Sequence, residues 1–467
     1  MIDILNIKQA IIDQATSGKL SKHFESDVDI KLLISVLPAP TSRREKLLKQ
    51  KSEIEDELFE IPSYWAWVKL GEISSYGDTA IKTLAKDLDA DAWVLELEDI
   101  DVGGKIIRKT RVETRKPIGE KTVFRNGQLL YSKLRPYLKK VLVADEDGVS
   151  TPELICLDVF CGINTKYIKL CLTNSWVDKV VNKRAYGIKM PRVDAGFMVN
   201  LPIPLPPIEE QNRIVDKVEE ILEVLDHIDS LQSQYATNVE VLKCKLIDAG
   251  IRGKLTEQLP EDGNAEDLYN QIQDEKARLI KESKIKKEKP LPDISEDEIP
   301  FEIPKSWKWV RIGKVINEVI VPQRDKPSFS GNIPWCRIED RDGIYLNGTK
   351  SGQYVSEETI REMNLRIFPV GTVLSACSGA SIGTFLVNTV ECCTNQTFNG
   401  LVCNDLFYNW YLFWFLKSEI NRLKSMGSGS AMAYISQDKI RNMLIPLPPI
   451  AEQKRIVEKL EAMMELL

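Results

Sequence analysis

The chain has 467 residues, of which 43% are apolar, 28% charged and 7% aromatic, and its formal net charge is −6. This length predicts two to four domains, and the apolar fraction is typical of a globular protein. Only two histidines occur, His23 and His227, which excludes multi-histidine metal sites and duplicated Ser-His-Asp centres. The slightly acidic total argues against a nucleic-acid partner unless the basic residues are clustered.

The cysteine pattern and the N-terminus both indicate a cytoplasmic protein. The nine cysteines include no Cys-x-x-Cys pair and are odd in number, which favours free thiols in a reducing compartment. The first residues lack a basic region before an apolar core, so we expect no secretory signal. The most apolar run, residues 407–416, is about half as long as a membrane crossing and is predicted to be a buried helix.

Two segments of the sequence recur 242 positions later. FEIPSYWAWVKLGEI begins at Phe59 and recurs as FEIPKSWKWVRIGKV from Phe301, while IPLPPIEEQNRIVDKVEEIL begins at Ile203 and recurs as IPLPPIAEQKRIVEKLEAMM from Ile445. A third pair of motifs, SGKL and RGKL, is offset by 235 positions, because the connector that follows is seven residues longer in the second copy. The sequence between the motifs differs far more than the motifs do. We therefore predict two copies of one scaffold that present different surfaces.

The repeat predicts five segments in chain order. These are a half-helix with a connector (1–58), a globular domain (59–205), a long helix with a charged connector (206–300), a second globular domain (301–447) and a final half-helix (448–467). Short β-rich runs inside the domains, such as residues 93–97 and 139–145, indicate a mixed α/β domain with an irregular sheet. The connector 281–298 is basic, then proline-containing, then acidic, and predicts a solvated linker.

A long helix is predicted after each Leu-Pro-Pro-Ile motif. Apolar residues from Ile214 to Leu246 follow a three-and-four spacing, as in a coiled-coil heptad. A Pro-Pro pair precedes this pattern and a glycine follows it, so the helix should run from Glu209 to Ile251, about 65 Å. In the second copy the pattern stops at the C-terminus, and the N-terminal residues match its missing half. The two half-helices are therefore expected to form a second helix, antiparallel to the first, in a circular and pseudo-two-fold arrangement.

The order of these duplicated motifs resembles the specificity subunits of type I restriction–modification systems. The resemblance is carried by Trp65, Trp67 and Gly71, which recur as Trp307, Trp309 and Gly313, by Leu-Pro-Pro-Ile-x-Glu-Gln at 205–211 and 447–453, and by SGKL and RGKL. It covers nearly the whole chain. It implies an α+β fold in which two mixed α/β target-recognition domains are separated by two long antiparallel helices. Each domain would read one half of a bipartite DNA sequence, and the helices would set the spacing between the halves.

The resemblance also implies partners. These are double-stranded DNA, two methyltransferase subunits docked on the helices, and restriction or translocase subunits bound through them. S-adenosylmethionine, ATP and magnesium are expected on the partner subunits, and no cofactor or metal is expected in this chain. The expected partner-binding residues lie at the start of each long helix and are Glu210, Gln211, Arg213, Glu452, Gln453 and Arg455.

A cluster of basic residues in the first domain supports a nucleic-acid partner. Between residues 105 and 140 twelve lysines and arginines stand against two glutamates, Glu113 and Glu120, which gives a local charge of +10. Such a cluster is typical of phosphate binding, and a merely solvated basic surface is the alternative. The candidate DNA-binding residues of this domain are Arg108, Lys109, Arg111, Lys133, Arg135, Tyr137, Lys139, Lys140, Lys189 and Arg192.

The second domain has no such cluster, and its candidates are polar residues in loops. Hydroxyl groups in the loop 374–384 and amides in 393–400 suit contacts with phosphates or base edges, although both segments also suit ordinary turns. The candidate DNA-binding residues here are Ser378, Ser381, Asn395, Gln396, Ser430 and Tyr434.

No catalytic motif was found in the sequence. It contains no GxxxxGK[ST] and no GxGxxG after a strand, and the Leu-Pro-Pro-Ile motif lacks the amide and aromatic residue that hold a flipped base. The acidic pairs Glu98-Asp99 and Glu339-Asp340 are expected to support the scaffold rather than bind magnesium. We therefore expect a non-catalytic subunit of a methyltransferase and endonuclease complex. The alternative is a coiled-coil interaction scaffold that does not bind nucleic acid.

Overall fold

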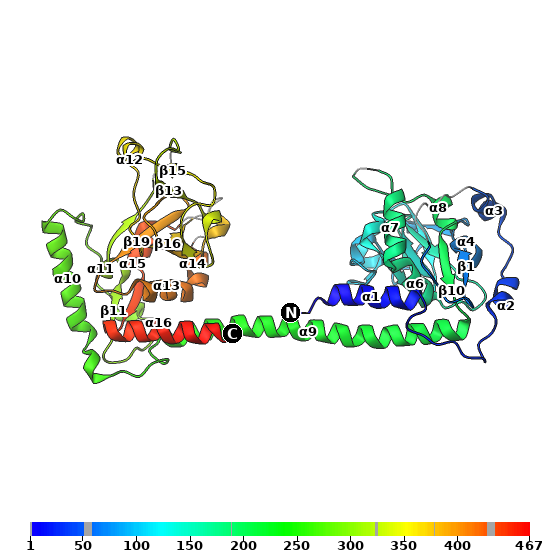
Figure 1. Ribbon diagram of the computed structural model, residues 1–467, viewed down its shortest axis with the longest axis horizontal. Coiled ribbons are helices and arrows are strands. Elements are labelled where there is room, and N and C mark those ends of the chain that lie inside the picture. Colours follow the sequence, from blue (N-terminus) through cyan, green and yellow to red (C-terminus); the bar gives the residue numbers. More distant parts are fainter. Residues whose placement is uncertain (1, 51–57, 188, 323–325, 378, 427–434) are drawn as a thin grey trace. The chain divides into compact units, whose positions relative to one another are not determined.

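A computed structural model describes residues 2–50, 58–187, 189–322, 326–377, 379–426 and 435–467. The chain forms two units, Met1–Ser233 and Gln234–Leu467. The boundary between them falls within α9 (Ile208–Ile251), a helix of 44 residues. Figure 1 labels the elements of both units.

The first unit combines three small sheets with short helices. Its strands pair in the orders β2-β5-β8-β3-β4, β7-β6-β9 and β1-β10. The strands are β1 (Ala66–Lys69), β2 (Lys82–Leu84), β3 (Trp93–Leu95), β4 (Thr110–Arg111), β5 (Glu120–Phe124), β6 (Leu129–Ser132), β7 (Val141–Val143), β8 (Gly148–Ser150), β9 (Leu154–Leu157) and β10 (Pro202–Leu205). The helices that precede α9 are α1 (Ile4–Thr16), α2 (Ile30–Ser35), α3 (Ser42–Leu48), α4 (Leu70–Ile73), α5 (Val112–Arg115), α6 (Thr165–Thr173), α7 (Ser175–Arg184) and α8 (Ala195–Val199).

The second unit has the sheet orders β12-β19-β16-β17-β14, β15-β13-β18 and β11-β20. Its strands are β11 (Lys308–Arg311), β12 (Ile316–Ile320), β13 (Ile333–Cys336), β14 (Tyr345–Leu346), β15 (Tyr354–Val355), β16 (Val373–Ala376), β17 (Phe385–Asn388), β18 (Cys393–Thr394), β19 (Phe398–Cys403) and β20 (Leu444–Leu447). Its helices are α10 (Ala265–Lys281), α11 (Ile312–Val315), α12 (Glu357–Met363), α13 (Asn409–Ser418), α14 (Ile420–Met426), α15 (Gln437–Asn442) and α16 (Ile450–Glu465).

Part of each unit is the same scaffold, residue for residue. The β1–β10 pairing recurs in β11–β20 with every partner shifted by 242 positions. The three strands β7-β6-β9 recur as β17-β16-β19 with the same register, shifted by 244 positions. Outside these strands the sheets differ, because β12 and β14 extend the second set whereas the first set stays separate. The predicted mixed α/β fold built on an internal repeat is confirmed.

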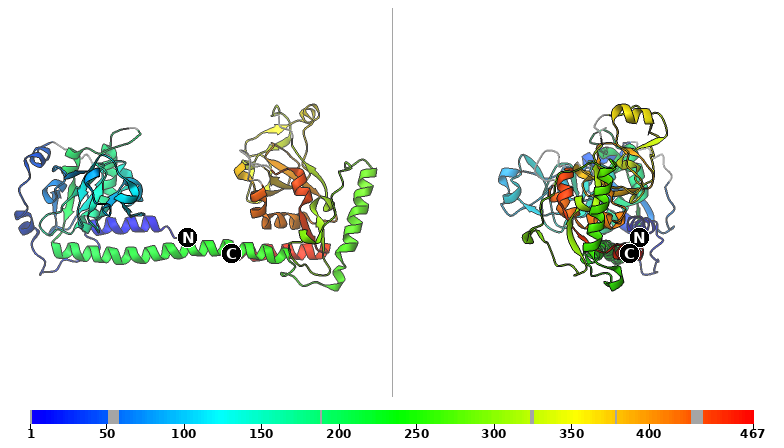
Figure 2. Two further views of the ribbon diagram at one scale, coloured as in Figure 1. Left: turned by 180° about the vertical axis from the view of Figure 1, so that it is seen from behind. Right: turned by 90° about the vertical axis from the view of Figure 1, so that its left-hand side faces the viewer.

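The terminal helices lie along α9, each within its own unit. In the first unit the Ile2 N–H donates to Gln232 Oε1 at 2.6 Å and Lys8 pairs with Asp226, so α1 runs antiparallel to α9. In the second unit Ile456 and Leu460 of α16 approach Gly250. Figures 1 and 2 show both helices beside α9. The long helix predicted after the Pro-Pro pair is confirmed, whereas joining of the two terminal helices into one stays a prediction.

Each unit has its own apolar core beneath these helices. Trp65 and Ile214 lie in the core of the first unit, and Trp307 and Ile456 lie in the core of the second. The apolar run at 407–416 forms most of α13, whose Tyr411, Leu412, Phe413, Phe415 and Leu416 are buried, as predicted. Among the described residues, no helix combines the length and apolar character that a membrane crossing requires.

The connector after α10 differs from the freely solvated linker that its composition predicts. Most of its side chains are exposed, but its main chain is fixed by two buried arginines. Arg311 donates to the carbonyls of Pro292 at 2.8 Å and Asp293 at 2.9 Å, and Arg441 donates to the carbonyl of Lys289 at 3.3 Å. Buried guanidinium groups require acceptors, and the connector supplies them with its backbone. The amino-acid composition cannot predict these arginine contacts, because the acceptors are main-chain atoms.

Candidate nucleic-acid interface

The start of α9 contains a buried carboxylate that ties three segments together. Glu210 lies in the first turn of the helix and is fully buried. Its Oε2 accepts a hydrogen bond from Trp65 Nε1 at 3.2 Å. Its Oε1 accepts from Ser21 Oγ at 2.5 Å and from Tyr64 Oη at 3.4 Å. The helix, the segment that leads into β1 and the N-terminal connector therefore meet at one side chain.

The start of α16 repeats this arrangement in the second unit. Glu452 Oε2 accepts from Trp307 Nε1 at 2.8 Å. Its Oε1 accepts from Thr256 Oγ1 at 3.1 Å and from Gln258 Nε2 at 2.9 Å. In both units the tryptophan precedes the glutamate by 145 positions. We call this set of contacts, with the glutamine and the ion pair described next, the helix-start site.

The glutamine of the motif is also used internally. The Gln211 amide accepts from the Asn164 N–H at 2.9 Å and donates to the Pro206 carbonyl at 2.8 Å. Gln453 repeats both contacts, at 3.0 and 2.9 Å. The side-chain amide thus joins the start of each helix to the Leu-Pro-Pro segment before it and to the residue that precedes α6 or α13.

An ion pair completes each helix-start site. Arg213 donates to both oxygens of Asp27, at 2.9 and 2.6 Å, and Arg455 donates to both oxygens of Asp262, with the Nη1–Oδ1 distance at 2.8 Å. Both aspartate side chains are almost fully buried. Hydrogen bonds from the arginines lower the pKa of Asp27 and of Asp262 below the ordinary aspartate value.

These contacts correct the predicted partner-binding role of the motif. Glu210, Gln211, Glu452 and Gln453 are buried, and their polar atoms are already paired within the unit. The guanidinium groups of Arg213 and Arg455 are held by aspartates. Charged residues at a helix start usually face solvent, which is why the sequence alone suggested a docking site. The structure assigns the four buried residues to holding each unit together. Arg213 and Arg455, whose side chains are 34% and 30% exposed, stay predictions as partner contacts.

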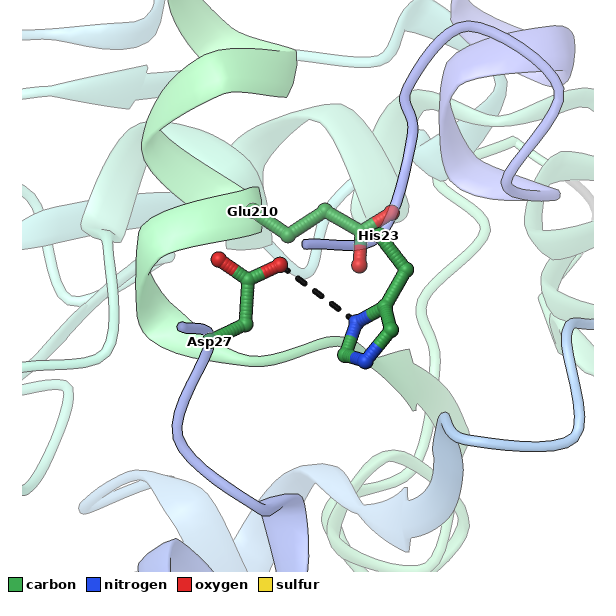
Figure 3. Close-up of side chains that lie close together, drawn as sticks. All are labelled: His23, Asp27 and Glu210. Atoms are coloured by element: carbon green, nitrogen blue, oxygen red, sulfur yellow. Dashed lines mark ion pairs between the residues drawn. The ribbon is translucent and has the colours of Figure 1, made fainter. Parts of the chain in front are cut away.

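Three ligand-type side chains also lie close together at the first helix-start site. Figure 3 shows His23, Asp27 and Glu210, whose ligand atoms lie within 4.8 Å of one another. Arg213 occupies both Asp27 oxygens, and the second unit places Gln258 where His23 stands. A cation here would have to displace an arginine from a buried carboxylate, which is unfavourable. We therefore assign this cluster to the scaffold and not to a metal.

The basic cluster of the first unit is largely neutralised by acids outside it. Asp99 pairs with Arg108 at 2.8 Å and with Arg115 at 2.6 Å. The other contacts are Lys109–Asp145, Arg111–Glu146, Lys121–Glu96, Lys133–Glu153, Arg192–Glu153 and Lys139–Asp178, while Lys140 donates to the carbonyls of Leu97 and Ile100. The local charge of +10 overstates the free positive charge, because these acids lie mostly on neighbouring segments that the sequence count left out.

Two loops bring several predicted residues together. Leu134 forms an antiparallel bridge with Arg192, and the Arg135 N–H donates to the Pro191 carbonyl at 2.7 Å. The loop that contains Arg135 and Tyr137 therefore lies against the loop 186–193, which contains Lys189. The side chains of this loop surface are Arg135, Tyr137, Tyr186, Lys189 and Met190, all of them exposed.

The loop surface has the chemistry of a nucleic-acid contact. In the part of the chain that the structure describes, Arg135 and Lys189 have no carboxylate partner. The tyrosines are half exposed or more, Tyr137 at 50% and Tyr186 at 59%. Tyr186 and Met190 were not predicted, because only Lys189 and Arg192 were selected from this second segment. The aromatic residue next to these cations, Tyr186, was the signal that could have extended the prediction.

The second unit pairs the corresponding segments in the same way. The Ile435 N–H donates to the Cys377 carbonyl at 2.9 Å, as the Val193 N–H donates to the Lys133 carbonyl at 3.1 Å. Ser381 ends a short 3₁₀ turn in this loop. Gln396 is exposed, and its carbonyl accepts from Cys377 Sγ of the same loop at 3.5 Å.

Asn395 has the turn role that was the alternative for it, since its Oδ1 accepts from the Thr397 N–H at 3.3 Å. Ser378, Ser430 and Tyr434 lie outside the described residues. One residue of each acidic pair has the predicted scaffold role. Asp99 and Asp340 each accept from a backbone N–H three residues earlier, at 3.0 and 2.6 Å.

The comparisons with known proteins agree with this architecture. Residues 304–467 match the family model for the type I restriction modification DNA specificity domain. The chain is 25% identical to the type I restriction enzyme EcoAI specificity subunit of Escherichia coli, over 99% of this chain and 90% of that protein. It is also 25% identical to the EcoEI specificity subunit of E. coli, over 98% and 89%.

A solved chain shares the fold. It comes from a study of complex assembly and conformational transition in the type I R-M system, and it aligns with a TM-score of 0.63 and 20% identity over 88% of this chain and 92% of its own. The fold and the duplicated helix-start sites define a two-unit repeat protein with a central long helix. Residues 304–467 thus match the DNA specificity domain of type I restriction–modification systems, and the chain is similar over nearly its whole length to specificity subunits of type I restriction enzymes.

Two tryptophans of one motif offer a direct test of the helix-start site. Trp307→Phe removes the indole donor to buried Glu452, so we expect the free energy of unfolding to fall by about 1.5–3 kcal/mol beyond the loss of ring area. Trp309→Phe is the matched control, because Trp309 Nε1 is buried without a hydrogen-bond partner among the described residues. Urea unfolding of both variants measures the difference. Equal losses would show that the indole–carboxylate bond does not stabilise the unit.

The buried ion pairs predict a dependence of stability on pH. The pKa of Asp27 is lowered in the folded chain, so its pairing with Arg213 stabilises the fold above about pH 4 and is lost as the pH falls through the lowered value. Asp27→Asn should lower the free energy of unfolding by about 1.5–3 kcal/mol at pH 7. The gap from the wild type should narrow toward pH 3. A gap that is the same at both pH values would contradict the proposed charge contribution.

Proposed function

We propose that this chain recognises a specific sequence in double-stranded DNA and leaves the chemistry to partner subunits. The observation that carries the proposal is the contrast within the repeat. The two units share the helix-start site and three paired strands, yet their loops carry different side chains. A repeated scaffold with different loops suits the reading of two different half-sites, and the similarity to type I restriction enzyme specificity subunits supports DNA as the ligand.

Each unit would read one half-site with its paired loops. In the first unit, Arg135 and Lys189 suit contacts with phosphates or with the acceptor edge of guanine, and Tyr137 and Tyr186 supply apolar and hydroxyl groups. In the second unit, Ser381 and Gln396 supply uncharged donors and acceptors. Because the two sets share no residue type, the half-sites are expected to be unrelated in sequence.

The helix α9 would set the distance between the half-sites. It is continuous from Ile208 to Ile251, and a continuous helix changes length by 1.5 Å for each residue added. The segment from Asp226 to Tyr235 is the part for which the terminal helices offer no sequence match. The length of the spacer in the DNA target should therefore depend on this segment, whereas the recognised bases should not.

Two methyltransferase subunits would dock on the exposed faces of the long helices. Apolar side chains that face solvent on α9 support such a docking surface, in place of the buried glutamates and glutamines that the sequence suggested. They are Val224, Leu231, Tyr235, Val241 and Leu242. Restriction or translocase subunits would bind through the methyltransferase. S-adenosylmethionine, ATP and magnesium would be held by those partners, and this chain would supply no catalytic residue.

The loop surface gives a prediction with an internal control. Arg135→Gln should weaken binding to duplex DNA and reduce the slope of log affinity against log salt by about one. Arg111→Gln removes the same charge from a residue already paired with Glu146, so we expect a smaller change in affinity and in the salt slope. Fluorescence anisotropy with a labelled duplex at several salt concentrations, with the methyltransferase present, makes the comparison.

The same titration decides between the proposed function and a scaffold that does not bind nucleic acid. Absence of salt-dependent duplex binding by the wild-type chain, with its partner present, would favour the scaffold. Equal effects of Arg135→Gln and Arg111→Gln would remove the loop surface from the interface.

The spacing role of α9 is tested by insertion. Adding four residues of helix-forming sequence between Leu225 and Tyr235 should change the number of unspecified bases between the half-sites and leave both halves unchanged. Sequencing of DNA selected by the wild-type and extended chains, each with the methyltransferase, gives the result. A change in the recognised bases themselves would contradict the proposed division between loops and helix.

A further inference from the structure

The second unit contains a cavity lined mostly by cations. It measures about 230 Å³ and lies between α10, connector residues 285–291, α11 and the end of α15. Its basic lining residues are Lys276, Lys286, Lys287, Lys289, Lys314 and Arg441, and Glu288 is the acidic residue among the described lining. None of these residues belongs to the predicted recognition loops.

Hydrogen bonds hold the walls of the cavity in place. Lys276 Nζ donates to the Gly313 carbonyl at 2.8 Å and to the Ile316 carbonyl, which joins α10 to α11. Arg441 pairs with Glu288 at 2.8 Å and donates to the Lys289 carbonyl at 3.3 Å, which joins α15 to the connector. The cavity is therefore preformed, and a ligand would not have to order the connector.

Several donors in these walls lack acceptors. Arg441 is only 7% exposed, and its Nε is buried with no hydrogen-bond partner among the described residues. In the same described part, Lys286, Lys287, Lys289 and Lys314 have no carboxylate partner. These four lysines therefore give the lining positive charge that no described carboxylate neutralises.

The first unit shows that the scaffold does not require this cluster. Arg44 takes the place of Lys276, since its Nη1 donates to the Ser74 carbonyl at 3.1 Å, the counterpart of the Ile316 carbonyl. The counterparts of Lys314 and Arg441, 242 positions earlier, are Glu72 and Val199. One cation at this carbonyl is thus shared by both units, whereas Lys314 and Arg441 have no basic counterpart 242 positions earlier.

We propose that this cavity binds a phosphate group, either of free phosphate or a nucleotide, or of a nucleic-acid backbone. Ammonium groups that converge from several segments match the charge and tetrahedral oxygens of phosphate. The lysines without a carboxylate partner supply the donors, and the single Glu288 is already paired with Arg441.

The first test is calorimetry on the full-length chain with sodium phosphate in a chloride buffer. The wild-type chain should bind one phosphate, and Lys314→Gln should weaken binding at least about tenfold. Lys305→Gln is the matched control, because Lys305 is exposed and does not line the cavity. Lys314→Glu introduces the first unit's residue and should abolish binding. No saturable binding, or equal affinities for Lys314→Gln and Lys305→Gln, would overturn the proposal.

A second test uses sulfate, whose charge does not change between pH 6 and pH 10. Burial lowers the pKa of Lys276 to about 8, with Arg441 and Lys314 adding to the effect and Glu288 opposing it. The charged groups that face Lys276 or lie beside it are Lys286, Lys287, Glu288 and Lys289 of the connector, Lys314 of α11, and Asp438 and Arg441 of α15. An anion favours protonated Lys276, so sulfate affinity should fall as the pH rises through 8. A flat profile would contradict the assigned site.

The source of the phosphate group is decided by comparing ligands. If the phosphate belongs to a nucleic-acid backbone, Lys314→Gln should lower the affinity for duplex DNA and should reduce the slope of log affinity against log salt by about one. In that case a mononucleotide should bind no tighter than inorganic phosphate. If it belongs to a free nucleotide, the mononucleotide should bind tighter and duplex affinity should not change. A variant that loses phosphate binding but still recognises its DNA sequence would not contradict the proposed function. The two proposals can therefore be tested independently of each other.

Discussion

A buried carboxylate at the start of each long helix is the group on which the rest of each unit depends. Glu210 and Glu452 lie in the first helical turn, where the helix dipole favours a negative charge. Each accepts hydrogen bonds from a tryptophan before the first strand and from side chains in the connector. An ionised group without these donors would cost several kcal/mol in the protein interior. The helix, the first strand and the connector therefore depend on one another for stability.

This constraint explains why the borders of the repeat agree so closely while the interior differs. The Trp-x-Trp and Leu-Pro-Pro-Ile motifs supply the two sides of the helix-start site, 145 positions apart in both units. Between them the chain keeps three strands in register and the pairing of two loops, which is seen in Arg135–Pro191 and in Cys377–Ile435. The loops themselves carry no part of the helix-start site. Their side chains are free to differ, and with them the surface that each unit presents.

The sequence predicted the long helix, the repeat and the aromatic helix α13, because periodicity and burial are local properties. It misjudged groups whose partners are distant in the chain. Glu210 was predicted to be a docking residue because its hydrogen-bond donor, Trp65, lies 145 positions away in the sequence. The equal spacing between tryptophan and glutamate in both copies could have indicated this contact. The basic cluster at residues 105–140 was predicted to carry free positive charge because the acids that neutralise it, such as Asp145, lie outside that range. The connector was predicted to be solvated because its composition is charged. Its backbone carbonyls bind Arg311, and composition cannot predict a contact made by main-chain atoms.

The central proposal is that one duplicated scaffold presents two independent DNA-recognition surfaces and that α9 sets the distance between them. Mapping of methylated bases across a genome that carries this chain and its methyltransferase tests that claim most directly. The account predicts a target of two short, unrelated elements separated by a fixed number of unspecified bases, with methylation lost when the chain is removed. A single contiguous element, two identical half-sites, or methylation that persists without the chain would contradict it.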